Sequence, residues 1–271
     1  MGNATRLRQE LSVRSLELAN SKKLLHELSD ASMPSVVFGA DANGEHGNFH
    51  PASYRRICGN PEWRKRLEKV HTASRRMMLR SDWQWRELDC ANSSDALLMN
   101  IFCHPAICKS EHVAALLGVE LGSIPIFGYR PRLPLCSGKN DSTEIDMKLG
   151  DLLVEAKLTE SGLEKAAPQL YERYGSLEAV FDPAELPFAN GRLQSYQFVR
   201  GVLAAHHHRA SFCLMFDERR PELAQRWYSV LRAVRSAELR TRMKILTLQE
   251  LSSALPRTLQ SFLTMKYGIT G

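Results

Sequence analysis

The sequence lacks the apolar runs that a membrane protein needs. No segment of its 271 residues reaches the ~18 consecutive apolar residues required to cross a bilayer. The N-terminal segment carries charged residues where a secretion signal has its apolar stretch. The six cysteines include neither a Cys-x-x-Cys pair nor a Cys/His zinc spacing. These absences argue against a membrane protein and a disulfide scaffold, and we expect a cytoplasmic protein with reduced thiols.

Internal repeats and low-complexity tracts are also absent, and the composition is that of an ordinary folded protein. Hydrophobic residues make up 44% and charged residues 24%, both close to the averages for soluble domains. The length fits one large domain or two small ones. The 36 Lys and Arg against 30 Asp and Glu give a net charge of +6. This modest excess favours a polyanionic partner without proving one.

The first 90 residues predict an N-terminal helical extension. Leucines at helical spacing predict an amphipathic helix over 5–29, and the Gly, Asn and Pro of 39–61 predict a long connection. Residues 62–80 predict a basic amphipathic helix. Its candidate nucleic-acid contacts are Arg75, Arg76 and Arg80. Phosphate contact and a solvated helix face remain equal alternatives for these arginines.

Residues 91–271 predict an α/β domain that forms one compact unit with this extension. Helices are expected at 93–103, 110–118, 192–206, 221–235 and 256–267, and strands at 124–133, 142–150, 151–160, 210–216 and 243–248. The three consecutive strands predict a β-meander at the centre of the chain. Asn100 is the one awkward polar residue of the apolar helix at 93–103.

Charged residues collect on one face of the hairpin predicted at 142–160. Strand alternation puts Glu144 and Asp146 together on the first strand, and Glu155 and Lys157 together on the second. A two-residue turn at 150 and 151 would place Asp146 directly opposite Glu155. The two carboxylates would then lie about 5 Å apart between Cβ atoms.

Two carboxylates this close repel one another unless a cation lies between them. Carboxylate oxygens suit Mg²⁺ or Mn²⁺, ions that also bind phosphate oxygens. Lys157 projects into the same site, where it would orient or help deprotonate a metal-bound water and stabilise negative charge on phosphorus. The hairpin therefore predicts a site for phosphodiester hydrolysis.

These residues resemble the PD-(D/E)xK nuclease superfamily, which includes restriction endonucleases and repair nucleases. The resemblance is carried by Asp146 and, after eight intervening residues, by Glu155-Ala156-Lys157. It implies a restriction-endonuclease-like core of helix, three strands, helix and strand (αβββαβ), with a central mixed β-sheet flanked by helices. It also implies Asp146 and Glu155 as ligands of Mg²⁺, with Mn²⁺ as a substitute, and Lys157 as the catalytic lysine.

Further positions resemble the restriction-endonuclease branch of this superfamily. The helix at 93–103 has Asn100 where many relatives carry a glutamate, which implies single-metal catalysis or weak activity. Gln197 and Arg200 resemble a Gln-bearing helix that often closes the active site. Gln197 is therefore a candidate catalytic residue, with Asn100, Glu144 and Arg200 as possible support.

The resemblance implies a metal-dependent nuclease that cleaves DNA, an endodeoxyribonuclease of restriction, defence or repair type. A homodimer stays open. One alternative is a nuclease-fold nucleic-acid-binding protein with little or no turnover. Another is an interaction module whose polar hairpin is a solvated face with cross-strand ion pairs. Asn100 is more often a satisfied core amide than a catalytic group, and Gln197 and Arg200 are equally compatible with a helix surface.

Overall fold

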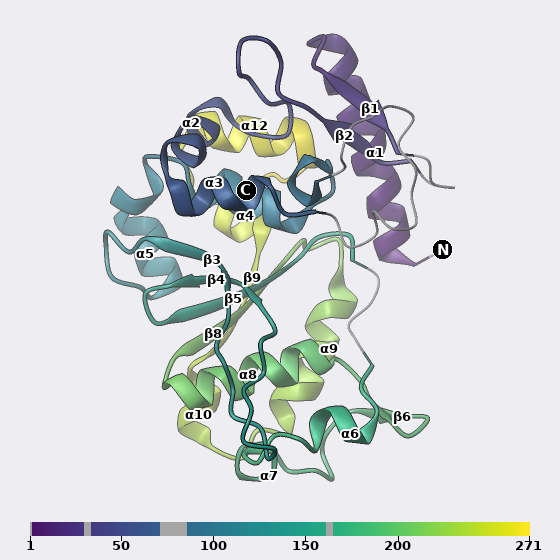
Figure 1. Cartoon of the computed structure of the whole chain (residues 1–271), viewed down its shortest axis with the longest axis vertical. Coiled ribbons are helices and arrows are strands. Elements are labelled where there is room, and N and C mark those ends of the chain that lie inside the picture. The colour runs from purple at the N-terminus through teal and green to yellow at the C-terminus, as the bar shows by residue number, and fades with distance from the viewer. Residues whose placement is uncertain (1, 30–33, 71–85, 161–164) are drawn as a thin grey trace. The chain divides into compact units, whose positions relative to one another are not determined.

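A computed structural model describes residues 2–29, 34–70, 86–160 and 165–271 (Figure 1). The chain forms two compact units. The first unit comprises Met1–Ser123 and Leu248–Gly271, and the second comprises Ile124–Thr247. No helix in the described ranges combines the length and apolar character needed to span a membrane.

The first unit is mainly helical. Its helices are α1 (Asn3–Ser21), α2 (Pro51–Gly59), α3 (Pro61–Leu67), α4 (Ser94–Phe102), α5 (Glu111–Leu117), α11 (Leu248–Ser253) and α12 (Arg257–Tyr267). Strands β1 (His26–Leu28) and β2 (Val36–Phe38) form a small antiparallel sheet, and short 3₁₀ turns occur at Glu87–Asp89 and Ile107–Lys109. The apolar helix expected at 93–103 is α4, and the Ser93 hydroxyl caps it by accepting the Ala96 N–H at 3.1 Å.

Three expectations for the N-terminal region are wrong in detail. The first helix ends at Ser21, and residues 26–28 pair as β1. The predicted connection at 39–61 contains α2, which starts with a proline in its first turn and has the His50 ring as its cap. In the described part of the predicted basic helix, α3 ends at Leu67 and Val70 forms a β-bridge with Arg86, while residues 71–80 lie outside the described ranges.

The boundary expected near residue 90 does not coincide with the division of the chain. Helix α4 packs against α2, and α12 packs against α1. Because these contacts join distant segments, residues 91–123 and 248–271 belong with the N-terminal helices. Local sequence patterns carry no direct record of such pairings.

The second unit is built on a five-stranded mixed sheet, as expected. The strands are β3 (Pro125–Tyr129), β4 (Ile145–Leu149), β5 (Leu152–Lys157), β8 (Ser211–Phe216) and β9 (Met243–Thr247), and they lie in that order. Strands β3, β4 and β5 form an antiparallel meander, whereas β8 and β9 extend the sheet in parallel. The predicted mixed α/β architecture is confirmed.

Helices and a small hairpin complete the second unit. The helices are α6 (Pro168–Tyr171), α7 (Leu177–Val180), α8 (Tyr196–His208), α9 (Pro221–Arg232) and α10 (Ala237–Thr241), and the hairpin pairs β6 (Phe188–Ala189) with β7 (Arg192–Leu193). Helix α8 is the crossover between the parallel strands β5 and β8.

Helix α8 packs closely against β8. A Cβ atom at Gly201 would lie only 2.3 Å from the Phe212 ring, so a glycine is needed there. Phe212 and Phe198 also pack against Trp227 of α9. Since α8 leads directly into β8, which is parallel to β5, its first turn lies towards the end of the sheet where β5 finishes.

Candidate active site

The β4–β5 hairpin has the predicted register. Leu149 pairs with Leu152 across the two-residue turn, and Gly150 adopts a positive φ of 56°. The ladder ends at the pair of Met147 and Val154. The next residue along each strand is Asp146 on β4 and Glu155 on β5, as the alternation predicted.

Asp146 is attached to the end of β5 through its side chain. One carboxylate oxygen, Oδ2, accepts the backbone N–H of Ala156 at 2.8 Å. A side chain thus takes the place of a ladder hydrogen bond where the two strands separate. The contact holds the Asp146 carboxylate against the strand segment that carries Glu155 and Lys157.

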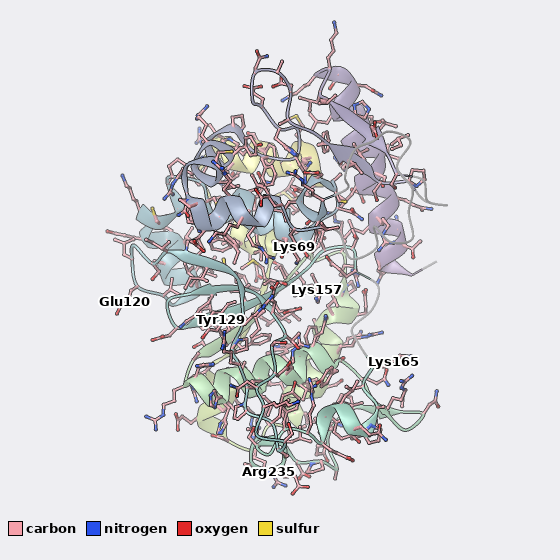
Figure 2. All side chains as sticks on the ribbon, in the orientation of Figure 1. Lys69, Glu120, Tyr129, Lys157, Lys165 and Arg235 are labelled. Atoms are coloured by element: carbon pink, nitrogen blue, oxygen red, sulfur yellow. The ribbon has the colours of Figure 1, made fainter. Side chains whose placement is uncertain are left out.

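Glu155 and Lys157 form a buried ion pair. The Lys157 Nζ donates to Glu155 Oε1 at 2.7 Å, and the side chains of Lys157 and Glu155 are only 6% and 5% exposed, respectively. Figure 2 labels Lys157. This burial excludes a solvated hairpin face at these two positions, because both charges are almost completely removed from water.

Lys157 is held in its protonated form. Burial alone would lower the pKa of this amine, but the negative charges of Glu155, Asp146 and Glu160 raise it above the ordinary lysine value. The amine is therefore an ammonium at neutral pH. The negative charges of three carboxylates therefore act on the Lys157 ammonium.

The donor set suits a hard cation with few protein ligands. Within the described ranges, no three His, Cys, Asp or Glu side chains form a group that could hold a metal. The carboxylates of Asp146 and Glu155 still offer oxygen ligands, and Mg²⁺ commonly uses one or two carboxylates while phosphate and water complete its shell. The residues present therefore fit Mg²⁺ better than an ion that needs a full protein cage.

Gln197 and Arg200 lie on the first turns of α8. The Gln197 Oε1 atom is buried and accepts no hydrogen bond from the described residues. Arg200 is buried, its Nη2 donates to the Glu144 carbonyl at 3.4 Å, and its guanidinium lies over the Tyr196 ring. Arg200 thus ties α8 to the residue that precedes β4, and neither side chain is a plain solvent-facing group.

Glu144 and Asn100 engage other partners. The Glu144 carboxylate accepts a hydrogen bond from Arg130 at 2.9 Å. Asn100 belongs to the first unit and is fully buried. Its side-chain NH₂ donates to the carbonyls of Asn48 and Ala96, and its Oδ1 accepts the His50 N–H. Asn100 therefore has the hydrogen bonds of a satisfied core amide. Arg75, Arg76 and Arg80 lie outside the described residues.

Sequence reasoning missed two groups next to β5. Glu160 Oε2 accepts the Leu158 N–H at 2.7 Å, which turns its carboxylate back towards the end of the strand. Arg220 is buried and donates to the carbonyls of Leu158 and Glu160 at 2.8 and 3.2 Å. Glu160 stands in the same charged segment as Lys157 and could have been found there. Arg220 lies 60 residues beyond Glu160 in the chain, and no spacing links it to the site.

A tyrosine network at the start of α8 was also missed. The hydroxyls of Tyr174 and Tyr196 lie 3.1 Å apart, and Tyr174 donates to the Asp141 carboxylate. Arg173 Nη2 donates to both hydroxyls. Burial works against ionisation of Asp141, but hydrogen bonds from Thr143 and Tyr174 lower its pKa. The network links the first turn of α8 to the segment before β4.

A known protein family matches this chain. Residues 19–268 match the family described as restriction endonuclease associating with ARP. No curated protein and no solved structure matches the chain. Because the match covers nearly the whole sequence, the chain belongs to this restriction-endonuclease-like family.

Proposed function

We propose that this protein is a Mg²⁺-dependent endodeoxyribonuclease that hydrolyses phosphodiester bonds in DNA, and that Mn²⁺ can replace Mg²⁺. The observation that carries the proposal is the buried ion pair of Glu155 and Lys157 beside the Asp146 carboxylate. Family membership supports a nuclease-like role. DNA is the substrate implied by the family's description.

Asp146 and Glu155 would hold the metal ion. When bound, Mg²⁺ supplies positive charge that polarises a phosphodiester and favours the ionisation of water. The Ala156 N–H fixes the orientation of Asp146, so this ligand is in place before substrate binds. Glu155 has a second task, because it also holds the ammonium of Lys157.

Lys157 acts as a cation and not as a base. Its raised pKa keeps a proton on Nζ at neutral pH. The ammonium can donate a hydrogen bond to a phosphate oxygen on which negative charge develops, and burial makes that interaction stronger than it would be in water. The proton of the attacking water would pass to solvent, and solvent would return a proton to the leaving oxygen.

The first turns of α8 would position substrate. Gln197 has an amide oxygen without a hydrogen bond from the described residues, so it can accept one from the attacking water. Arg200 is a positioning residue because its contact with the Glu144 carbonyl holds α8 beside the start of β4. The tyrosine network also ties α8 to the segment before β4, through Tyr196, Tyr174 and Asp141.

A plasmid cleavage assay tests the proposal. Purified wild-type protein should cut supercoiled plasmid in Mg²⁺ or Mn²⁺ and should stop in EDTA. Lys157→Ala should slow cleavage by about 100-fold or more, the usual effect of removing one group that stabilises transition-state charge. Lys148→Ala is the matched control: Lys148 lies on β4 with its ammonium 5.1 Å from the Tyr129 ring, and its removal should leave cleavage unchanged.

The same assay separates the alternatives. Metal-independent DNA binding without cleavage in either metal would overturn the catalytic proposal in favour of an inactive nuclease fold. Neither binding nor cleavage would indicate an interaction module. Because Lys157→Ala leaves a buried carboxylate, its fold must be checked by circular dichroism. The double variant Glu155→Gln/Lys157→Met removes both charges and provides a second inactive protein.

A further inference from the structure

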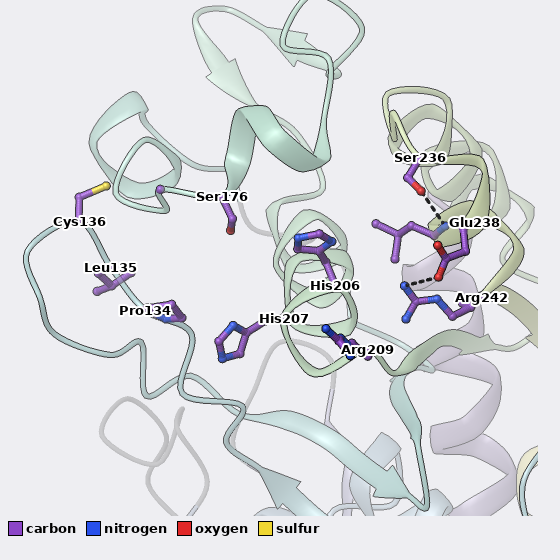
Figure 3. Close-up of a pocket in the computed structure, with 12 residues that line it drawn as sticks. Pro134, Leu135, Cys136, Ser176, His206, His207, Arg209, Ser236, Glu238 and Arg242 are labelled. Atoms are coloured by element: carbon purple, nitrogen blue, oxygen red, sulfur yellow. Dashed lines mark hydrogen bonds and ion pairs between the residues drawn. The ribbon is translucent and has the colours of Figure 1, made fainter.

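The second unit contains a cavity of about 880 Å³ at the C-terminal end of α8. Figure 3 shows His206, His207 and Arg209 on this helix end, with residues 134–136 on one side and Arg242 on the other. Helix α8 has 13 residues, so its two ends lie about 20 Å apart along the axis. Because Glu155 and Lys157 belong with the first turn of α8, the cavity is separate from the candidate active site.

The charged groups that line this cavity are mostly basic. Arg209 and Arg242 are permanent cations, and the rings of His206 and His207 also line the cavity. Among the described residues of the lining, Glu238 alone is acidic, and its carboxylate lies 3.8 Å from Arg242 Nη2. The cavity therefore carries a positive charge that an anion would balance.

Several of these groups have hydrogen-bonding capacity to spare. The guanidinium of Arg209 and the imidazole of His206 make no hydrogen bond or ion pair with any described residue. Arg242 Nη1 donates to the Ala210 carbonyl at 3.0 Å, while its buried Nε has no partner in the described part of the chain. The lining thus offers cationic side chains from two segments of the chain, and neither arginine is held in a strong ion pair by a described residue.

The backbone at Arg209 adds a second observation. Arg209 ends α8 with a φ of 53°, in the left-handed region where glycine is the usual residue. Arginine is strained there relative to glycine. Its side chain faces a basic cavity and has no partner among the described residues, which fits a role in holding a ligand.

The His207 ring lies near two other histidine rings at this helix end. Burial, followed by the nearby rings of His208 and His206, lowers the pKa of His207. The rings of His207 and His208 lie 4.8 Å apart between centroids. A bound anion would oppose this effect and favour the imidazolium form.

We propose that this cavity binds a phosphate group, carried either by a free nucleotide or by a nucleic-acid chain. Arg209 and Arg242 supply the permanent charge, and the ring N–H groups of His206 and His207 are further donors on the same helix end. Pro134, Leu135 and Leu239 provide apolar walls against which the rest of the ligand can lie. Phosphate recognition by several convergent cationic donors is a common use of arginine.

Calorimetric titration of the full chain tests this proposal with three probes in EDTA: inorganic phosphate, deoxyadenosine monophosphate and a short single-stranded oligonucleotide. We expect saturable binding of a phosphate-bearing probe. Arg209→Gln should weaken that binding by about tenfold, because it removes a charge-assisted hydrogen bond. A tighter complex with the mononucleotide would identify a free nucleotide as the ligand, and a tighter complex with the oligonucleotide would identify a nucleic-acid chain.

Arg226→Gln is the matched control. Arg226 is an exposed arginine of α9 outside the cavity lining, so this variant makes the same change in net charge. Equal effects of the two variants would overturn the proposal, as would the absence of saturable binding by all three probes. Asp146→Asn should bind phosphate in the cavity like the wild type, so failure of cleavage and failure of this proposal can be told apart.

Discussion

Removing the Glu155 carboxylate should strongly destabilise the metal-free protein. In Glu155→Gln the Lys157 ammonium stays buried, at 6% side-chain exposure, without the carboxylate that lies 2.7 Å away in the wild type. Breaking a buried ion pair from one side typically costs about 3 to 5 kcal/mol. Over a chain of this size, that corresponds to a fall in Tm of about 10 °C. If repulsion from Asp146 were the only interaction of the Glu155 carboxylate, removing its charge would not lower the stability. The buried Lys157 ammonium is the reason that we expect a decrease.

The measurement is thermal unfolding followed by circular dichroism in EDTA. Glu185→Gln provides the matched control, because Glu185 pairs with Arg232 at 2.9 Å while their side chains are 49% and 73% exposed. Breaking that surface pair should cost less than about 1 kcal/mol. The double variant Glu155→Gln/Lys157→Met should recover most of the missing stability, since it leaves no buried charge of this pair unpaired.

The pH dependence of this effect follows from the sign of the lysine shift. The pKa of Lys157 is raised in the folded protein, so its contribution is fully present below the ordinary lysine pKa of 10.5 and disappears only at strongly alkaline pH. The contribution of this pair to wild-type stability should therefore stay constant from about pH 6 to about pH 9. If Glu155→Gln cost no more stability than Glu185→Gln, the Glu155 carboxylate would not be sustaining a buried ammonium.

Three further predictions concern residues away from β5. Asn100→Ala should destabilise the protein by about 2 kcal/mol or more, because it leaves the buried His50 N–H and Asn48 carbonyl unpaired. Cleavage per folded molecule should stay unchanged, and a selective decrease in cleavage would give Asn100 a catalytic role. Burial, with the positive charges of His50 and Arg56, lowers the pKa of His104 to about 4, so up to about 3 kcal/mol of stability should be present above pH 6.5 and should disappear as the pH falls towards 4. His104→Asn should flatten that decline in acid unfolding experiments, and an unchanged profile would contradict the assignment. Finally, the slope of log affinity for DNA against log salt concentration should flatten by about 0.9 for each phosphate-binding arginine that is removed. Filter binding with a triple glutamine variant of Arg75, Arg76 and Arg80 would measure this slope, and an unchanged slope would indicate that these arginines are solvated.

The β4–β5 hairpin was predictable from sequence because its determinants are local. Alternation sets the faces, and the turn at residues 150 and 151 sets the register, so the pairing of Leu149 with Leu152 needed no long-range information. The order of the central strands and of α8 was predictable for the same reason. Each of these elements has an apolar pattern within its own residues that identifies it as a strand or a helix.

The rest depended on packing that alternation does not encode. A polar face with Glu155 and Lys157 is compatible with solvent or with burial, and only the packed structure distinguishes them. Arg220 reaches its carbonyl partners across about sixty residues. Helix α2 was hidden because Gly, Asn and Pro around it suggested a loop, although Pro51 and His50 are suitable residues for a helix start.

The position of the buried ion pair argues for function more strongly than for stability. The remaining residues of β5 are all apolar, namely Leu152, Leu153, Val154 and Ala156. Apolar side chains at positions 155 and 157 would therefore simply continue the core. Replacing a buried pair with apolar residues is often neutral or stabilising, because desolvation offsets much of the attraction between the charges. Stability alone therefore gives little reason for a glutamate and a lysine at the end of a buried strand. The proposed function does give a reason. A metal ion would use the Glu155 carboxylate, and a phosphate would use the Lys157 ammonium.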